Sequence, residues 1–190
     1  MAPSSSSSTV TKKNTNRVTK RTSTSTTKPK TPRINNKSQV PDRVLTDVLL
    51  AIKSVHLKNI ASRRKNHEYR KYRLRDGVER LWLYETAEDG GKASITHVAV
   101  IPSDERRTPG TVPTEPFGIG NDDFNAGLKQ SKYGYPILEL YELVKPVSLG
   151  EMKTKWGMSA PMGWRYLVPD LWMDRWGDEE NRDANVKKVF

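Results

Sequence analysis

The chain has 190 residues, of which 34% are hydrophobic and 29% charged, and its formal net charge is +11. It contains no cysteine, which excludes disulfides and cysteine-ligated zinc, and three histidines alone are a poor ligand set, so we expect no metal and no cofactor. No apolar run approaches the roughly 20 residues that cross a bilayer, so we expect no membrane partner.

Residues 1–43 are rich in Ser, Thr, Lys and Arg. They hold ten basic residues and one acidic residue, a net charge of +9, whereas residues 44–190 hold 23 basic and 21 acidic residues. This segment has no aromatic residue and few aliphatic ones, so it cannot bury enough apolar surface to offset the entropy of ordering. We predict a disordered basic tail at 1–43 and one domain at 44–190.

The charge of the tail indicates two functions. Lysines and arginines attract phosphates by releasing counterions, and such clusters also serve as nuclear localisation signals. A nuclear location is therefore favoured over a cytoplasmic one. A mitochondrial presequence is the weaker interpretation because the tail lacks an amphipathic apolar stripe. A solubilising tail without a specific partner remains open.

The start of the domain, residues 44–62, has two interpretations. Its first apolar residues recur at a helical period, but VLLAI at 48–52 also fits a short buried strand. Ser54 would then be the N-cap of a following helix, with Leu57 and Ile60 on its apolar face. Periodicity alone does not choose between them.

The later part of the chain has mostly strand patterns. Ser148, with a glutamate three residues on, predicts a helix at 148–156. In the loop at 117–136 we expect an ordered turn with a short helix from Asp122 or Asp123. Many short strands with few helices favour a barrel or curled sheet. The expected strands are 80–86, 93–101, 134–143 and 163–169, with a turn at 88–92.

One stretch carries a family-like motif. LLAIKSVHLKNIASRRKNHEYRKYRL, followed by GVERLWLYET, resembles the start of an ASCH domain in the PUA-like superfamily. That family opens with a strand of the form L-S-I-K-P, a helix, and a G-x-K-x-x-E-x-R motif. Lys53 matches the first lysine, and Arg63 replaces the glycine of the second motif. Lys65, Glu68 and Arg70 match its lysine, glutamate and arginine.

The resemblance implies a fold as well as a motif. It favours a strand at 48–52 and a helix at 54–62 over one long helix. It implies an α+β fold, a small, mostly β PUA-like barrel with two or three short helices beside the disordered N-terminal tail.

The resemblance also implies a function. PUA-like domains, including the ASCH, EVE and YTH branches, are generally implicated in binding RNA or DNA, and several hold a modified base in an aromatic pocket. Some bacterial ASCH proteins are amidohydrolases that act on acetylated cytidine with a lysine, a threonine directly after it, and a glutamate. Here Asn66 follows Lys65. An amide is not a nucleophile, so this departure argues against the hydrolase activity.

The motif at 65–73 is predicted to lie on a strand, where alternate side chains share a face. Asn66, Glu68 and Arg70 would then point one way. A carboxylate and a guanidinium on one face offer an acceptor and a fork of donors suited to a base edge or a phosphate. The alternative is a structural ion pair without a ligand.

Aromatic residues on the later strands are candidates for stacking on bases. Trp82, Tyr84 and Trp164 are such candidates, although aromatic residues on strands more often belong to the core. The Gly- and Asn-rich loop 117–135 is either a connector or part of the site.

The sequence therefore predicts a non-catalytic nucleic-acid-binding module that holds one nucleotide, with or without a modified base, in an aromatic-lined cleft between 65–72, 81–86 and 117–135. Its partner is RNA or DNA; the choice between them and the oligomeric state stay open. The alternatives are a small amidohydrolase acting on a modified nucleoside and a protein-interaction module in a larger nucleoprotein complex. The candidate binding residues are Lys53, Lys65, Asn66, Glu68, Arg70, Trp82, Tyr84, Asn121, Ser131, Lys132, Tyr133 and Trp164.

Overall fold

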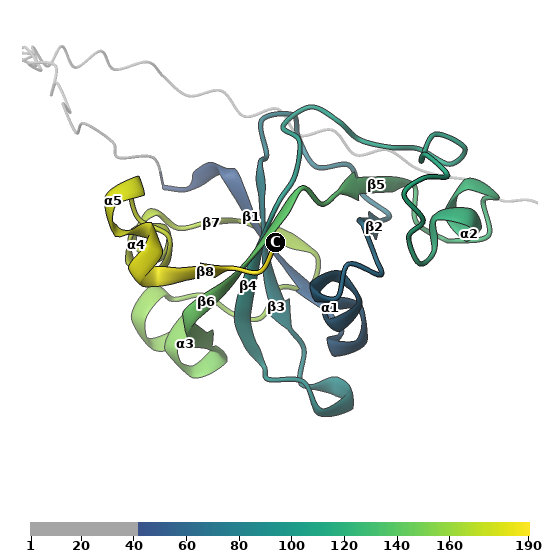
Figure 1. Ribbon diagram of the computed structural model, residues 1–190. Coiled ribbons are helices and arrows are strands. Elements are labelled where there is room, and N and C mark those ends of the chain that lie inside the picture. Colours follow the sequence, from purple (N-terminus) through teal and green to yellow (C-terminus); the bar gives the residue numbers. More distant parts are fainter. Residues whose placement is uncertain (1–41) are drawn as a thin grey trace, which may run out of the picture. The chain divides into compact units, whose positions relative to one another are not determined.

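The structure is a computed structural model that describes residues 42–190 (Figure 1). The predictions for the tail, its disorder and its nuclear targeting, concern residues that lie almost wholly outside this range. Within the described part, no helix is long and apolar enough to cross a membrane. The same residues contain no group of three or more His, Asp or Glu side chains that could hold a metal ion.

A six-stranded mixed sheet forms the centre of the fold (Figure 1). Its order is β7-β1-β3-β4-β6-β8, in which β1 and β3 are parallel and all other neighbours are antiparallel. The parallel pair needs a crossover connection, which holds the first helix. The strands are β1 (Val44–Ile52), β3 (Arg80–Glu85), β4 (Ser94–Val100), β6 (Glu139–Ser148), β7 (Trp164–Leu167) and β8 (Val186–Lys188).

Five short α-helices and one 3-10 turn accompany the sheet in residues 42–190, more than the two or three helices expected. Ser148 caps α3 as predicted, since its hydroxyl accepts the backbone N–H of Glu151 at 3.1 Å. The N-cap of α1 is Lys53, not Ser54. The helices are α1 (Ser54–Ala61), α2 (Asn121–Asn125), α3 (Leu149–Trp156), α4 (Pro169–Arg175) and α5 (Glu179–Asn185), with the 3-10 turn η1 at Glu88–Gly90.

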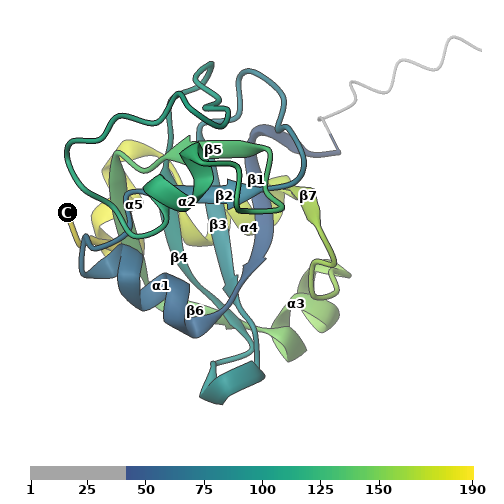
Figure 2. The same cartoon turned by 90° about the vertical axis from the view of Figure 1, so that its right-hand side faces the viewer.

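Both faces of the central sheet are covered. Leu81 and Leu83 of β3 pack in one core with α1, whereas Trp82 and Tyr84 point to the opposite core with α3 and α4. Figures 1 and 2 show α1 on one side of the sheet and α3 and α4 on the other. The alternation of β3 was therefore predicted correctly, but neither of its faces is open to solvent.

The strand expected at 134–143 is two strands. β5 (Tyr133–Pro136) pairs with β2 (His67–Arg70) in a separate two-stranded sheet, while β6 belongs to the central sheet. The chain changes sheets at Ile137 and Leu138, whose N–H groups donate to the carbonyls of Asn66 and Val100. An apolar pattern does not report such a change of partner. The small sheet lies on the same side of the central sheet as α1 (Figure 2).

Candidate nucleotide-binding site

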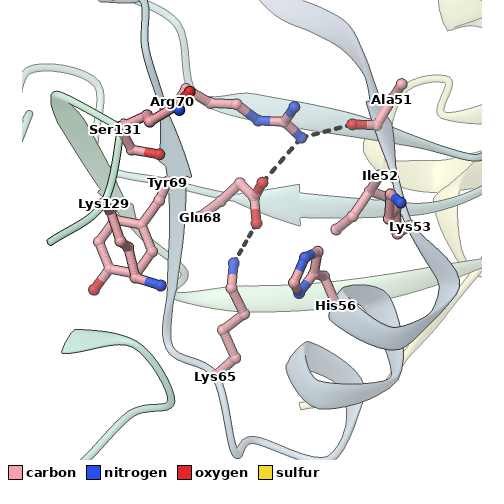
Figure 3. A pocket seen from close by; sticks show the side chains of 11 residues that line it. Ala51, Ile52, Lys53, His56, Lys65, Glu68, Tyr69, Arg70, Lys129 and Ser131 are labelled. Carbon is pink, nitrogen blue, oxygen red and sulfur yellow. Dashed lines mark hydrogen bonds and ion pairs between the residues drawn. The ribbon is translucent and has the colours of Figure 1, made fainter. Parts of the chain in front are cut away.

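A buried carboxylate lies at the centre of the site (Figure 3). Glu68 on β2 is 5% exposed, and one of its oxygens accepts a hydrogen bond from Nζ of Lys65. Its other oxygen pairs with the guanidinium of Arg70 at 2.9 Å. That guanidinium also donates to the carbonyl of Ala51 at 2.7 Å, which fixes β2 against the end of β1. The expected ion pair between Glu68 and Arg70 is thus present, and Lys65 joins it.

The geometry of this cluster differs from the expected alternation. Lys65 precedes β2, which begins at His67, so the two-residue period of a strand does not govern its direction. The side chain of Lys65 is free to turn back to Glu68, three residues on. The motif therefore gathers its three charged residues at one point.

Burial and charge act against each other in this cluster. Burial acts to raise the pKa of Glu68, but the cations Lys65 and Arg70 outweigh it and lower that pKa, so the carboxylate stays ionised. Burial also lowers the pKa of Lys65, by more than the attraction of Glu68 raises it. The site thus contains one ionised carboxylate, Glu68, that is paired with two basic side chains, Lys65 and Arg70.

A cavity of about 400 Å³ borders the cluster. It lies between the end of β1 with α1 on one side and the segment 129–131 on the other (Figure 3). Its lining contains one carboxylate, Glu68, and four cationic side chains, those of Lys53, Lys65, Arg70 and Lys129. Such a lining favours an anionic ligand.

Two of these cations lie at the rim and have partners outside the cavity. Lys53 is exposed and pairs with Glu88 at 3.0 Å, and Lys129 lies 3.7 Å from a carboxylate oxygen of Asp123. Exposed pairs of this kind are worth about 0–1 kcal/mol and exchange readily. The rim lysines can therefore turn to a bound anion.

Of four further predicted site residues, one lines this cavity and three do not. Ser131 lines the cavity, but Lys132 is exposed and Tyr133 is half-buried against the core, so neither lines it. Trp164 is on β7, in a different cavity. Ser131, Lys53 and the Lys65–Glu68–Arg70 cluster are the predicted residues that the structure brings together.

Asn66 does not point into this cavity. Its amide donates to the carbonyl of Pro116 at 2.9 Å, and its oxygen is hydrogen-bonded to Nδ1 of His67 at 2.8 Å. It lines a second cavity with Phe117 instead. The expectation that Asn66 shares a face with Glu68 is wrong, because residue 66 lies before the strand and is held by the loop.

Three further site residues are structural. Trp82 and Tyr84 are 0% and 4% exposed, so the strand that was expected to form part of the cleft offers no stacking surface. The sheet face that carries them is covered by α3 and α4. Asn121 is 1% exposed and accepts a hydrogen bond from the hydroxyl of Tyr69 at 2.7 Å, which ties α2 to β2, and it does not line the cavity.

Lys129, His56 and Tyr69 line the cavity but were not among the predicted residues. Tyr69 lies within the motif and His56 lies close to it in the sequence, so both could have been predicted from that proximity. Nothing in the sequence points to Lys129, because a single lysine in a loop belongs to no recognisable pattern. The structure brings it to β2 through a long-range packing of α2 on Tyr69, whose ring stacks on Phe124 at 4.4 Å.

No family profile matches the sequence, and no curated protein matches it significantly. Among solved structures, a serine-to-alanine variant of the ASCH protein from Zymomonas mobilis is similar, with 15% identity over 71% of this chain and 96% of that one and a TM-score of 0.50. The chain has the ASCH fold. A tyrosine-to-phenylalanine variant of the same protein gives 14% identity, coverage of 68% and 95%, and a TM-score of 0.50. The expected α+β fold is thereby confirmed as a fold of the ASCH type.

Proposed function

We propose that the domain binds RNA or DNA without catalysis and holds one nucleotide in the cavity beside Glu68. The observation that carries this proposal is the lining of four cations against one carboxylate. The volume of about 400 Å³ falls within the range of small-ligand pockets, about 300–1,000 Å³. A nucleotide supplies the phosphate that such a lining attracts and a base with polar edges.

Arg70 is the best placed donor for that ligand. Glu68 and the carbonyl of Ala51 hold its guanidinium in one orientation, so little freedom is lost when a ligand binds. Its Nε is buried and has no hydrogen-bond partner among the described residues. The side chain as a whole is 19% exposed, so a phosphate or base oxygen in the cavity would form a charge-assisted hydrogen bond with the open part of the guanidinium.

Base recognition would be polar and not chiefly aromatic. The ring of Tyr69 already packs on Phe124, and the ammonium groups of Lys65 and Lys129 lie 5.5 and 5.9 Å from its centroid. Burial, followed by the charge of Lys65, lowers the pKa of His56, so its imidazole is neutral at pH 7. A neutral imidazole offers one donor and one acceptor to a base edge, plain or modified.

Binding of single-stranded RNA and DNA, plain and base-modified, to the full chain at low salt tests the proposal by fluorescence anisotropy. Arg70→Gln should weaken binding about tenfold or more, since a charge-assisted hydrogen bond is worth about 1.5–3 kcal/mol. Lys129→Gln, at the half-exposed rim, should weaken it several-fold without a folding defect. Lys153→Gln on α3 is the control for a lost surface charge.

Two results would reject the proposal. The full chain could fail to bind any of these strands at low salt. Alternatively, Lys129→Gln and Arg70→Gln could bind as tightly as Lys153→Gln, which would place binding elsewhere. Thermal denaturation of each variant separates a lost contact from a lost fold.

Residues 1–43 would add sequence-independent attraction to phosphates and favour a nuclear location. Full chains in which the basic residues of 12–37 are changed to glutamine should keep any base preference and lose affinity and salt dependence. A fluorescent fusion of the same variant tests the location. A preference that disappears with the tail charges would move specificity out of the domain.

Hydrolysis of a modified nucleoside is the second candidate, and one observation favours it. Lys65 lines the cavity next to the carboxylate of Glu68, with a pKa lowered by burial, and Ser131 lines the same cavity. Incubation of the full chain with N4-acetylcytidine and related amides tests it, and absence of turnover removes it. Turnover abolished by Ser131→Ala would replace the binding proposal with this one.

A further inference from the structure

A further hollow lies along the edge strand β7. The hollow has a volume of about 460 Å³ and is separate from the cavity beside Glu68. We call it the β7-edge surface. It consists of Arg43, Leu45, Arg75, Trp164, Arg165 and Tyr166.

This surface has three cations without counter-charges. Arg43, Arg75 and Arg165 are exposed, and none forms an ion pair within residues 42–190. Residues 1–41 contain no Asp or Glu that could pair with them. Two acids adjoin these arginines in the sequence: Asp42 lines a neighbouring hollow, and Asp76 is paired with Arg73 at 2.8 Å. Three arginines therefore outnumber the carboxylates around them and leave the surface cationic.

Two aromatic rings stand among these arginines. Trp164 and Tyr166 are half-buried, so part of each ring is open, and they meet edge to face with centroids 5.2 Å apart. The guanidinium of Arg43 lies 5.9 Å from the centroid of Tyr166. Cationic groups beside aromatic faces are the arrangement by which single strands are held, the cations taking phosphates and the rings taking bases.

The β7-edge surface continues towards the cavity beside Glu68. In the register of β1 and β7, Trp164 lies opposite Leu50, next to the Ala51 carbonyl that Arg70 contacts. Tyr72 follows Arg70 by two residues, and its ring centroid lies 6.4 Å from that of Trp164.

Both sites are on one side of the sheet. Tyr72, Trp164 and Tyr166 pack against the same core as α1. From Ala51 back to Arg43 the chain extends about 25 Å, at about 3.3 Å per strand residue. That length accommodates several nucleotides of a single strand.

We propose that the β7-edge surface binds a single-stranded stretch of nucleic acid that adjoins the nucleotide held in the cavity. This inference rests on the proposed function for its direction but has its own residues. Arginines 43, 75 and 165 contact consecutive phosphates, and Trp164 stacks on an unpaired base. Duplexes bind less well because their bases are not free to stack on protein rings.

Binding to the full chain is measured for a mononucleotide and for single strands of about four and about twelve nucleotides. The double variant Arg75→Gln, Arg165→Gln should bind the mononucleotide as the wild type does. Longer strands should bind the wild type more tightly than the mononucleotide does, and the double variant should reduce this extra affinity at least tenfold. Its salt dependence should fall by about 1.4 on a log–log plot, about 0.7 for each phosphate contact. Trp164→Leu should reduce the same extra affinity. Both arginines are exposed, so the double variant folds.

Lys187→Gln is the matched control, since Lys187 is an exposed cation on β8, the opposite edge strand of the same sheet. The inference is overturned if the double variant keeps the extra affinity for longer strands. It is also overturned if Lys187→Gln loses as much of that affinity, because the overall positive charge would then explain the binding. A surface that takes a protein partner instead would also leave this extra affinity unchanged. Long strands that bind through Arg75 and Arg165 while the mononucleotide does not bind would reject the cavity proposal and keep this one.

Discussion

Two buried carboxylates of this domain, Asp47 and Glu68, are each held by an arginine, yet they differ in what surrounds them. Asp47 on β1 is 0% exposed and accepts hydrogen bonds from Arg80 at 2.8 and 2.9 Å, from the indole of Trp82 at 2.8 Å and from the hydroxyl of Thr46 at 2.6 Å. Both of its oxygens are therefore fully used by the protein.

Glu68 is as deeply buried but borders a cavity. Its partners Lys65 and Arg70 line that cavity, and Arg70 keeps one donor without a partner in the described part of the chain. Asp47 lines none of the cavities described above. A buried ion pair is thus weak evidence for a site by itself. Two features distinguish the Glu68 cluster from Asp47: the adjoining cavity and the Nε of Arg70 that has no partner among the described residues.

Asp47→Asn gives the largest expected effect on stability. It leaves Arg80, which is mostly buried, without its carboxylate, and breaking such a pair costs about 3–5 kcal/mol. Urea denaturation of the variant and the wild type measures this loss. Affinity for nucleic acid should be unchanged in the fraction that stays folded. If Asp47→Asn lost affinity for nucleic acid without losing stability, Asp47 would not be a purely structural carboxylate and would not differ from Glu68 in this respect.

Glu68→Gln should destabilise the domain by about 2–3 kcal/mol, since it leaves two cations without their counter-charge. Unlike Asp47→Asn, it leaves those cations beside a cavity that an anion can enter. Inorganic phosphate or a mononucleotide should therefore raise the melting temperature of Glu68→Gln by more than that of the wild type, through preferential binding to the folded state. Equal shifts in Glu68→Gln and Asp47→Asn would show that the cavity does not take anions.

Trp82→Phe should cost about 2 kcal/mol, because it removes a hydrogen bond to a charged acceptor in a filled core. It should not change nucleic-acid affinity, since Trp82 is closed off by α3 and α4. Anisotropy titration and urea denaturation of one preparation test both halves. Weaker binding with normal stability would restore Trp82 as a stacking residue.

The sequence predicted local features better than the partners of those features. The strand at 80–86, the capped helix at 148–156 and the Glu68–Arg70 pair all follow from neighbouring residues and were found. Trp82 was misplaced because alternation identifies two faces of a strand but not what covers each face. Here helices that follow much later in the chain cover the second face.

The site failed to follow from sequence for a similar reason. Asn66 was assigned to the face of Glu68 by counting along a strand that begins only at His67. Lys129 was missed because it reaches the cavity by the packing of Phe124 on Tyr69, a contact between segments far apart in the chain. Local periodicity carries no information about such contacts.

The smallest expected effect is on the pH dependence of stability and concerns His67, a buried neutral side chain beside the charged cluster. His67, next to Glu68 on β2, is buried, and its Nε2 has no hydrogen-bond partner among residues 42–190. Burial, and then the cations Arg107 and Lys65, lower its pKa to about 4. Its imidazole is therefore neutral in the folded protein over most of the pH range in which an unfolded chain would protonate it.

This pKa predicts a direction for the pH dependence of stability. Between pH of about 6.5 and 4 the unfolded chain binds the proton and the folded chain does not, so stability is complete above this window and falls as the pH falls through it. His67→Gln, which keeps a donor and an acceptor but does not titrate, should lose about 1–2 kcal/mol less than the wild type between about pH 7 and pH 5. Urea denaturation of both proteins at the two pH values measures the difference. Parallel losses would mean that the buried imidazole takes up its proton without unfolding, and that the surroundings of Glu68 tolerate a further cation.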